Sequence, residues 1–234
     1  MTNTLHRFSE HYAFEPRPDP RPVEDDFIVF AMATRNVNDD DLVEKYRTFA
    51  RLALAHNPVN VGDATKGGLF RPQQKLNPLA HWRRDARPEP ERLVADIDGH
   101  TTLAAVFRTR ADMEGFVRDI KAADLGVSIN ISAPIDAAAA CCKAAGLNRH
   151  SVEYSLGFQG RVERLPDRAV LEISTMCGHG MVSHGLVRKL CDWVKEGRRT
   201  PAEATTYLAR FCTCGVFNPP RAEKLFEKIR TGGS

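Results

Sequence analysis

Several features that would assign a protein class at once are missing from this chain of 234 residues. No uninterrupted apolar run approaches the roughly 18 residues that a membrane-spanning helix requires. The N-terminal stretch Met1–Pro16 also lacks the apolar core of a secretory signal. We therefore expect no membrane association and a cytoplasmic location.

An excess of one charge is missing as well. The 33 lysines and arginines nearly balance the 30 aspartates and glutamates, which leaves a formal net charge of +3, and no long basic run occurs. Proteins that bind nucleic acid need concentrated positive charge, so we expect no nucleic-acid partner. A hydrophobic fraction of 42% with 27% charged residues is typical of a globular protein with a buried core.

Cysteine is absent from the first 140 residues, and all six cysteines follow them: Cys141, Cys142, Cys177, Cys191, Cys212 and Cys214. In a reducing compartment such residues are not expected to form structural disulfides. A lone buried cysteine behaves as a small apolar residue, and Cys191, on an apolar helical stripe, fits that description. An adjacent pair, a Cys-Gly-His-Gly turn and a Cys-x-Cys turn do not.

Proline at alternate positions from residue 16 to residue 22 predicts an extended N-terminal arm over residues 1–26. Aromatic residues within this arm give it apolar groups for docking. Residues 57–91, rich in proline, glycine and asparagine, predict a long loop. We expect the arm and this loop to contact a protein partner or a second copy of the chain.

Residues 27–234 are predicted to form a single α/β or α+β domain, in which a mixed sheet packs with helices and the C-terminal third is helical. Strands are predicted at residues 27–32, 93–97, 101–107, 127–131, 152–158 and 170–174, with a hairpin at Asp98-Gly99. Helices are predicted at residues 39–56, 111–124, 134–146, 181–196 and 201–212 and after residue 218, with N-caps at Asn38, Ser132, Thr200 and Asn218.

The predicted elements direct four cysteines toward one centre in the C-terminal half. Helical spacing places Cys142 on the inner face of its helix and Cys141 about 100° away, although which of the two is a ligand stays open. Cys177 is expected between a strand and a helix N-terminus, where a thiolate is stabilised. Cys212 ends a helix, and Cys214 lies in the turn that follows it. We predict Cys142, Cys177, Cys212 and Cys214 as metal ligands.

Four thiolates suit either a [4Fe–4S] cluster or a tetrahedral zinc ion. The cysteine spacing matches neither a zinc ribbon nor a ferredoxin run. Because the chain can fold on its own core, a structural zinc has less to contribute. We therefore predict a [4Fe–4S] cluster, with zinc as the alternative. The protein would be a small redox or lyase-type enzyme, or an accessory or electron-transfer subunit.

A thiol enzyme is a further alternative, in which Cys177 is the nucleophile or the acid–base group and His179 lies beside it. His179 would otherwise replace one thiolate as a ligand, donate a proton, or only hydrogen-bond its own turn. Gly178 and Gly180 are predicted to contribute to binding, because glycine permits positive φ and a close approach of the backbone to a bound group.

Two local motifs resemble known families. Cys141-Cys142 followed by Cys177 resembles the CCG domains of heterodisulfide reductases, which carry iron–sulfur clusters. Here Lys143 replaces the glycine of that motif, and Cys-Gly-His-Gly replaces its closing cysteine pair. The stretch 176–180, Met-Cys-Gly-His-Gly, resembles the catalytic cysteine motif of proline racemases, but the second Cys-Gly-Thr-Gly motif of that family is absent. The first resemblance implies a cluster, and the second implies an epimerase-like catalyst.

Overall fold

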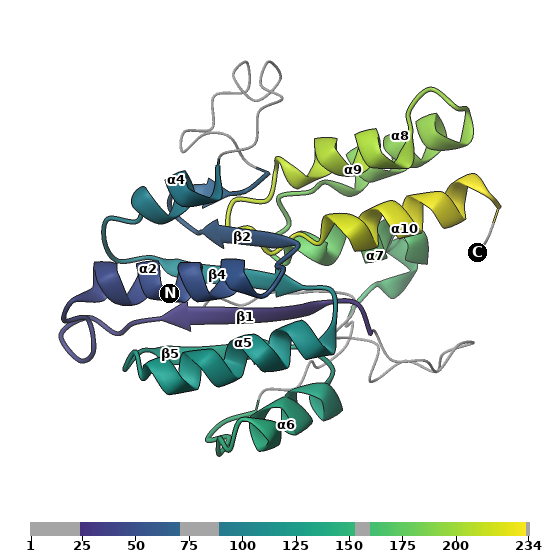
Figure 1. Cartoon of the computed structure of the whole chain (residues 1–234). Helices are drawn as coiled ribbons and strands as arrows, with labels where there is room; N and C mark the ends of the chain where they lie inside the picture. Colours follow the sequence, from purple (N-terminus) through teal and green to yellow (C-terminus); the bar gives the residue numbers. More distant parts are fainter. Residues whose placement is uncertain (1–23, 71–88, 153–159, 233–234) are drawn as a thin grey trace.

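The structure, a computed structural model, describes residues 24–70, 89–152 and 160–232. Its centre is a five-stranded sheet with the strand order β3-β2-β4-β1-β5 (Figure 1). The strands are β1 (Phe27–Met32), β2 (Asn60–Asp63), β3 (Gly67–Gly68), β4 (Thr102–Phe107) and β5 (Ser128–Ser132). Each neighbouring pair runs antiparallel, so this sheet is not the mixed sheet that was predicted. The predicted α/β class, with helices on a sheet and a helical C-terminal part, is confirmed.

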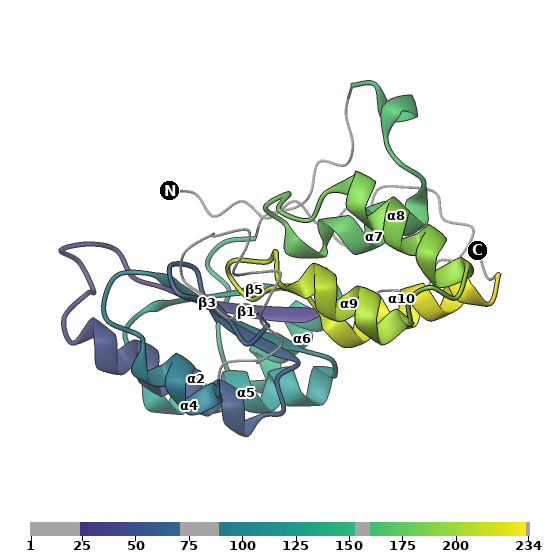
Figure 2. The same cartoon turned by 90° about the horizontal axis from the view of Figure 1, so that it is seen from above.

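Two groups of helices lie on the two faces of the sheet (Figure 2). On one face lie α2 (Leu42–Ala55), α4 (Pro90–Ala95), α5 (Arg110–Ala123) and α6 (Ile135–Ala144). On the other lie α7 (Arg168–Ser174), α8 (His184–Lys195), α9 (Pro201–Ala209) and α10 (Pro219–Arg230). Short 3₁₀ turns occur at η1 (Val162–Arg164) and η2 (Thr175–Cys177).

Strand β1 is apolar at nearly every position because both of its faces are covered. Ile28 and Phe30 face the C-terminal helices, whereas Phe27 and Val29 face α2 and α5. This alternation follows from the period of two in a strand. The sheet therefore separates two apolar cores, and the C-terminal core contains Cys177, Cys191, Cys212 and Cys214.

Local signals placed several helices correctly. The side chain of Thr109 caps α5, and Met113, Phe116, Val117 and Ile120, which recur at helical spacing, are buried. Thr200 and Glu203 form the predicted capping box of α9, and Asn218 caps α10. These features depend on residues within one or two turns of each other, which explains their success.

The strand predicted at residues 93–97 is wrong, because this segment lies mostly in α4. Pro90 occupies the first turn of α4, where its fixed φ favours a helix. The hairpin predicted at Asp98-Gly99 is also wrong, since β4 pairs instead with β1 and β2. A short apolar run is compatible with either a strand or a helix, and here the proline decides.

The strand predicted at residues 170–174 is wrong for a related reason. The side chain of Asp167 accepts the backbone N–H of Val170 at 3.1 Å and caps α7. Arg168 and Glu172, one helical turn apart, form an ion pair at 2.8 Å. Both interactions favour a helix over a strand. As a result, Cys177 follows the C-terminal end of a helix and not the end of a strand.

Two predicted N-caps have other roles. Helix α2 begins later than predicted, and the side chain of Asn38 accepts the N–H of Thr34 at 2.7 Å and donates to the carbonyl of Gly126 at 3.0 Å. Ser132 ends β5, and α6 begins after Pro134. The Asn38 side chain thus bonds its own turn and a neighbouring loop, a use that competes with helix capping.

Several predictions fall on residues outside those that the structure describes. They include residues 1–23 of the N-terminal arm, residues 71–88 of the long loop and most of the strand predicted at residues 152–158. The described part of residues 57–91 is not all loop, because it contains β2, β3 and the start of α4. Across the described ranges, we find no helix with the length and apolar character needed to traverse a lipid bilayer.

Candidate metal centre

Three of the four predicted ligands meet in the C-terminal core. Cys177 ends η2, Cys212 follows α9, and Cys214 lies in the loop before α10. Their exposed fractions are 0%, 1% and 3%. The Cys212 thiol lies near enough to the thiols of Cys177 and Cys214 to shift the pKa of both. The Sγ atom of Cys214 also lies 3.3 Å from Nδ1 of His179, whose residue is exposed. We call Cys177, Cys212, Cys214 and His179 the thiol cluster.

Cys142 is not brought to the thiol cluster. Its helix, α6, packs against α5, away from α7, α9 and α10 (Figure 1). Within α6, the fully buried residue is Cys141, which belongs to the core on the opposite face of the sheet, while Cys142 is only half-buried. The predicted inward direction of Cys142 is therefore wrong. Four consecutive alanines precede the pair, so the helix lacks a clear apolar stripe that would identify its inner face.

The prediction that Cys191 is a core residue is confirmed. Cys191 is 7% exposed and lies on α8 beside Val187, Leu190 and Val194, all of which are buried. Its thiol sits among apolar side chains, which raise its pKa to about 11 through burial. A buried thiol of this kind is unreactive and contributes by packing.

A backbone N–H group reaches each of the three clustered sulfurs. The N–H of His179 lies beside Cys177, that of Phe217 beside Cys212 and that of Val216 beside Cys214, and each lowers the pKa of its neighbouring thiol. The predicted helix N-terminus beside Cys177 is not present, because α8 begins only at residue 184. Hydrogen bonds from amides therefore take the place of the predicted helix dipole as the groups that favour a thiolate.

The thiols of the cluster influence one another strongly. The Cys212 thiol and burial raise the pKa of Cys177 far above its usual range. For Cys212, contact with Cys177 lowers the pKa, but contact with Cys214 and burial outweigh it, and the pKa rises to about 12. The pKa of Cys214 is lowered, mainly because the Cys212 thiol hydrogen-bonds to it. A nearby cation would favour the loss of protons from these thiols.

The glycines beside Cys177 adopt the conformation predicted for them. Gly178, the residue that follows η2, has a φ of 71°, and Gly180 has a φ of 70°. Space is open above Gly180, since a methyl group added there would have no atom within 4 Å. The turn between Cys177 and α8 therefore approaches the surface at the side where His179 lies.

Sequence reasoning missed the close backbone contacts that hold the Cys-x-Cys turn. Gly215 has φ of 74°, and a methyl group added to it would lie 2.6 Å from the Cα of Gly62 in β2. A methyl group added to Gly68 in β3 would lie 2.9 Å from the Cα of Gly215. Backbone therefore packs directly on backbone between the β2–β3 hairpin and the turn that follows Cys214. The closely spaced glycines of residues 62–68 were the available signal.

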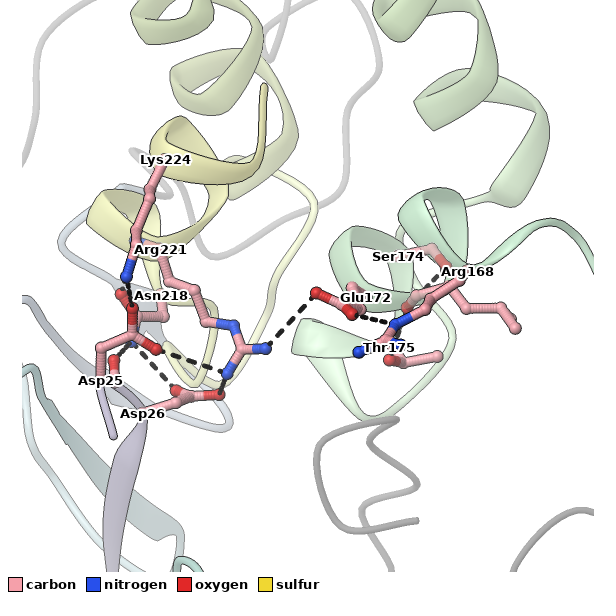
Figure 3. A network of polar contacts seen from close by, with 10 residues as sticks. Asp25, Asp26, Arg168, Glu172, Ser174, Thr175, Asn218, Arg221 and Lys224 are labelled. Carbon is pink, nitrogen blue, oxygen red and sulfur yellow. Dashed lines mark hydrogen bonds and ion pairs between the residues drawn. The ribbon is translucent and has the colours of Figure 1, made fainter. Parts of the chain in front are cut away.

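A buried ionic network links the two segments that carry the cysteines (Figure 3). Arg221 on α10, only 7% exposed, lies 3.6 Å from Asp26 and 3.7 Å from Asp25, just before β1. Its other terminal nitrogen lies 3.8 Å from Glu172 on α7. Helix α7 precedes Cys177, and α10 follows Cys214. Arg221 therefore connects the segments that carry these two cysteines to the start of β1.

Replacing Arg221 with methionine is expected to lower the free energy of unfolding by about 2–4 kcal/mol, because carboxylates would stay buried without their shared cation. Urea unfolding measures the effect. The double variant Arg221→Met/Asp26→Asn is expected to recover part of the loss, since it removes the most buried carboxylate. A double variant that is less stable than Arg221→Met would show that the unpaired carboxylate of Asp26 does not cause the loss.

Among the described residues, no group of three or more histidine, cysteine, aspartate and glutamate side chains is already arranged to hold a metal ion. Binding a metal in the thiol cluster would therefore require the loss of thiol protons and rotations of the side chains. No known protein family, curated protein or solved structure matches this chain. Its function is therefore argued from these side chains.

Proposed function

We propose that this protein binds a metal through Cys177, Cys212 and Cys214, with His179 as the fourth ligand. The observation that carries the proposal is that three buried thiols lie close together, with a backbone N–H beside each. Packing alone does not call for three amide donors directed at three sulfurs. Thiolates that ligate a metal do benefit from them, because the amides orient the ligands and share their charge.

The kinds of side chain gathered here favour a single tetrahedral ion such as zinc. Three cysteines and one histidine are a standard zinc set, and at Zn–S distances near 2.3 Å the sulfurs lie about 3.8 Å apart. Side-chain rotations of the neighbouring Cys177, Cys212 and Cys214 would be needed to reach that arrangement. The neutral imidazole of His179 would complete the tetrahedron once one of its nitrogens faces the ion.

A [4Fe–4S] cluster is the second candidate. It would place each thiolate on a different iron and thus hold the three sulfurs farther apart. The observation in its favour is the position of His179, which is exposed while the cysteines are buried, so one iron would lie near solvent. Such a cluster would suit a small redox or lyase-type enzyme or an electron-transfer subunit.

Cys177 is less suited to the role of a thiol nucleophile. It is 0% exposed, and its pKa is raised by the Cys212 thiol and by burial. Nucleophilic cysteines are instead accessible and have lowered pKa values. This combination favours a ligand over a racemase-like catalyst.

We further propose a cytoplasmic location and docking of the arm and the long loop on a protein partner or on a second copy of the chain. All six cysteines are free. A reducing compartment keeps such thiols available for a metal. The docking proposal depends on the aromatic residues of the arm, Phe8, Tyr12 and Phe14.

Anaerobic purification followed by metal and acid-labile sulfide analysis tests the proposed centre. One zinc per chain without sulfide and without colour would support the tetrahedral ion. A brown protein with about four irons and as many sulfides per chain would support the cluster. A protein that holds neither, even after incubation with zinc or with iron and sulfide under reducing conditions, would overturn the proposal.

A further inference from the structure

We propose that Asn60 is a positioning residue of the metal centre, an inference that rests on the proposed function. Asn60 is the first residue of β2 and is 1% exposed. Its side-chain Nδ2 donates to the carbonyl oxygen of Phe217 at 2.9 Å, although the two residues are 157 positions apart in the chain. Phe217 lies three residues after Cys214, in the loop that leads to α10.

The same residue, Phe217, supplies the N–H that reaches Cys212. Its carbonyl is held by Asn60, and the next residue, Asn218, donates to the backbone carbonyl of Asp25 at 2.8 Å and to Oδ1 of Asp26 at 3.0 Å. Two consecutive residues are thus tied to the sheet. These ties fix the position of Phe217 and so help to hold its N–H beside the sulfur of Cys212.

The other end of the Asn60 amide shows that the side chain does not serve packing alone. Its Oδ1 is buried and has no hydrogen-bond partner. An unsatisfied buried carbonyl oxygen costs about 1–3 kcal/mol, so an apolar residue would be the better choice if packing were the only requirement. The hydrogen bond to Phe217 is therefore the specific contribution of this residue. Strand β2 also supplies Gly62, on which the backbone of Cys214 and Gly215 rests.

The consequence concerns the metal more than the fold. An N–H hydrogen bond to a ligating sulfur withdraws electron density from it and stabilises its negative charge. If Phe217 loses its anchor, the Cys212 thiolate would be less stabilised, and the centre would bind its metal more weakly. A thiolate without this hydrogen bond is also a stronger electron donor, so charge transfer from sulfur to the metal would need less energy.

Binding of cobalt(II), a spectroscopic substitute for zinc, tests the inference. Asn60→Asp keeps the shape of the side chain but directs a carboxylate oxygen at the carbonyl of Phe217. We expect about a tenfold or greater loss of cobalt and zinc affinity in competition with a chelator, as for one lost hydrogen bond to a charged centre. We also expect the sulfur-to-cobalt band to move to longer wavelength, which a purely structural role would not cause.

Two controls separate positioning from general destabilisation. In Asn38→Asp the lost amide also donated to a backbone carbonyl, that of Gly126, but far from the thiol cluster. Ile120→Val weakens the core on the opposite face of the sheet. Both are expected to keep the wild-type affinity and spectrum. If Asn60→Asp does not fold, Asn60→Ser, which is shorter and cannot span the same distance, takes its place.

Wild-type affinity and an unshifted band in the Asn60 variants would overturn this inference while leaving the proposed metal centre intact. A wild-type protein that binds no cobalt, zinc or iron would overturn the proposed function and this inference together. A loss of affinity in Ile120→Val as large as in Asn60→Asp would also overturn it, because the effect would then follow stability and not the anchor.

Discussion

Serine in place of Cys212 is expected to remove nearly all of the bound metal. Cys212 is the central member of the thiol cluster, close to both other thiols, and it is almost fully buried. A serine hydroxyl there is a poor ligand for a thiolate-preferring metal. Cys177→Ser and Cys214→Ser are expected to have the same effect. Metal analysis after anaerobic purification, with circular dichroism to check folding, measures the outcome.

The remaining cysteines provide matched controls. Cys142→Ser is expected to keep the full metal content, because the structure places it on α6, away from the cluster. Cys191→Ala is expected to keep the metal and to lose about 1 kcal/mol of unfolding free energy, as for one small buried group. Full metal content in any two of the three cluster variants would show that the ligands lie elsewhere.

Alanine in place of Gly215 is expected to lower the free energy of unfolding by more than about 4 kcal/mol and to abolish metal binding. Its φ of 74° disfavours any side chain. In addition, the new methyl group would lie 2.6 Å from both Cα and N of Gly62. Because these are backbone atoms in β2, they cannot move without breaking the β2–β4 pairing or displacing the Cys-x-Cys turn.

Gly197→Ala isolates the conformational part of this effect. Gly197 has φ of 71°, close to that of Gly215, but a methyl group added there meets no atom within 4 Å. It is expected to cost only about 1 kcal/mol. Gly62→Ala isolates the overlap and is expected to resemble Gly215→Ala. Urea unfolding and metal analysis measure all three, and equal losses for Gly197→Ala and Gly215→Ala would mean that the close backbone contact is unimportant.

The Val170–Ser174 segment shows why part of the fold was not predictable. Five mostly apolar residues satisfy the pattern of a buried strand, and the same residues form α7, with one side against the C-terminal core. Asp167 can be recognised in the sequence as a possible N-cap. The sequence does not show whether this cap outweighs the β-propensity of the residues that follow. Because of this error, Cys177 was expected at a helix N-terminus, whereas it follows the C-terminal end of α7. The groups that stabilise its thiolate therefore differ from those predicted.

The contribution of Asn60 illustrates a different limit. Its hydrogen bond to Phe217 joins residues 157 positions apart, and the contact of Gly62 with Gly215 spans a similar distance. Hydrophobic periodicity and capping rules report on neighbours within a few turns, and they contain no information on which loop lies on which strand. Such contacts became visible only when the sheet and the C-terminal helices were placed together.

The sequence by itself determined which reactive side chains this protein has and which helices have clear local signals. It showed thiols and a histidine in glycine-containing turns, the inner face of α5 and the caps of α9 and α10, because these depend on residue type and on near neighbours. Only the tertiary structure decided which cysteines meet. It separated Cys142 from the other three with a sheet, since the side of a helix that faces a core is set by long-range packing when its own residues are nearly uniform in polarity.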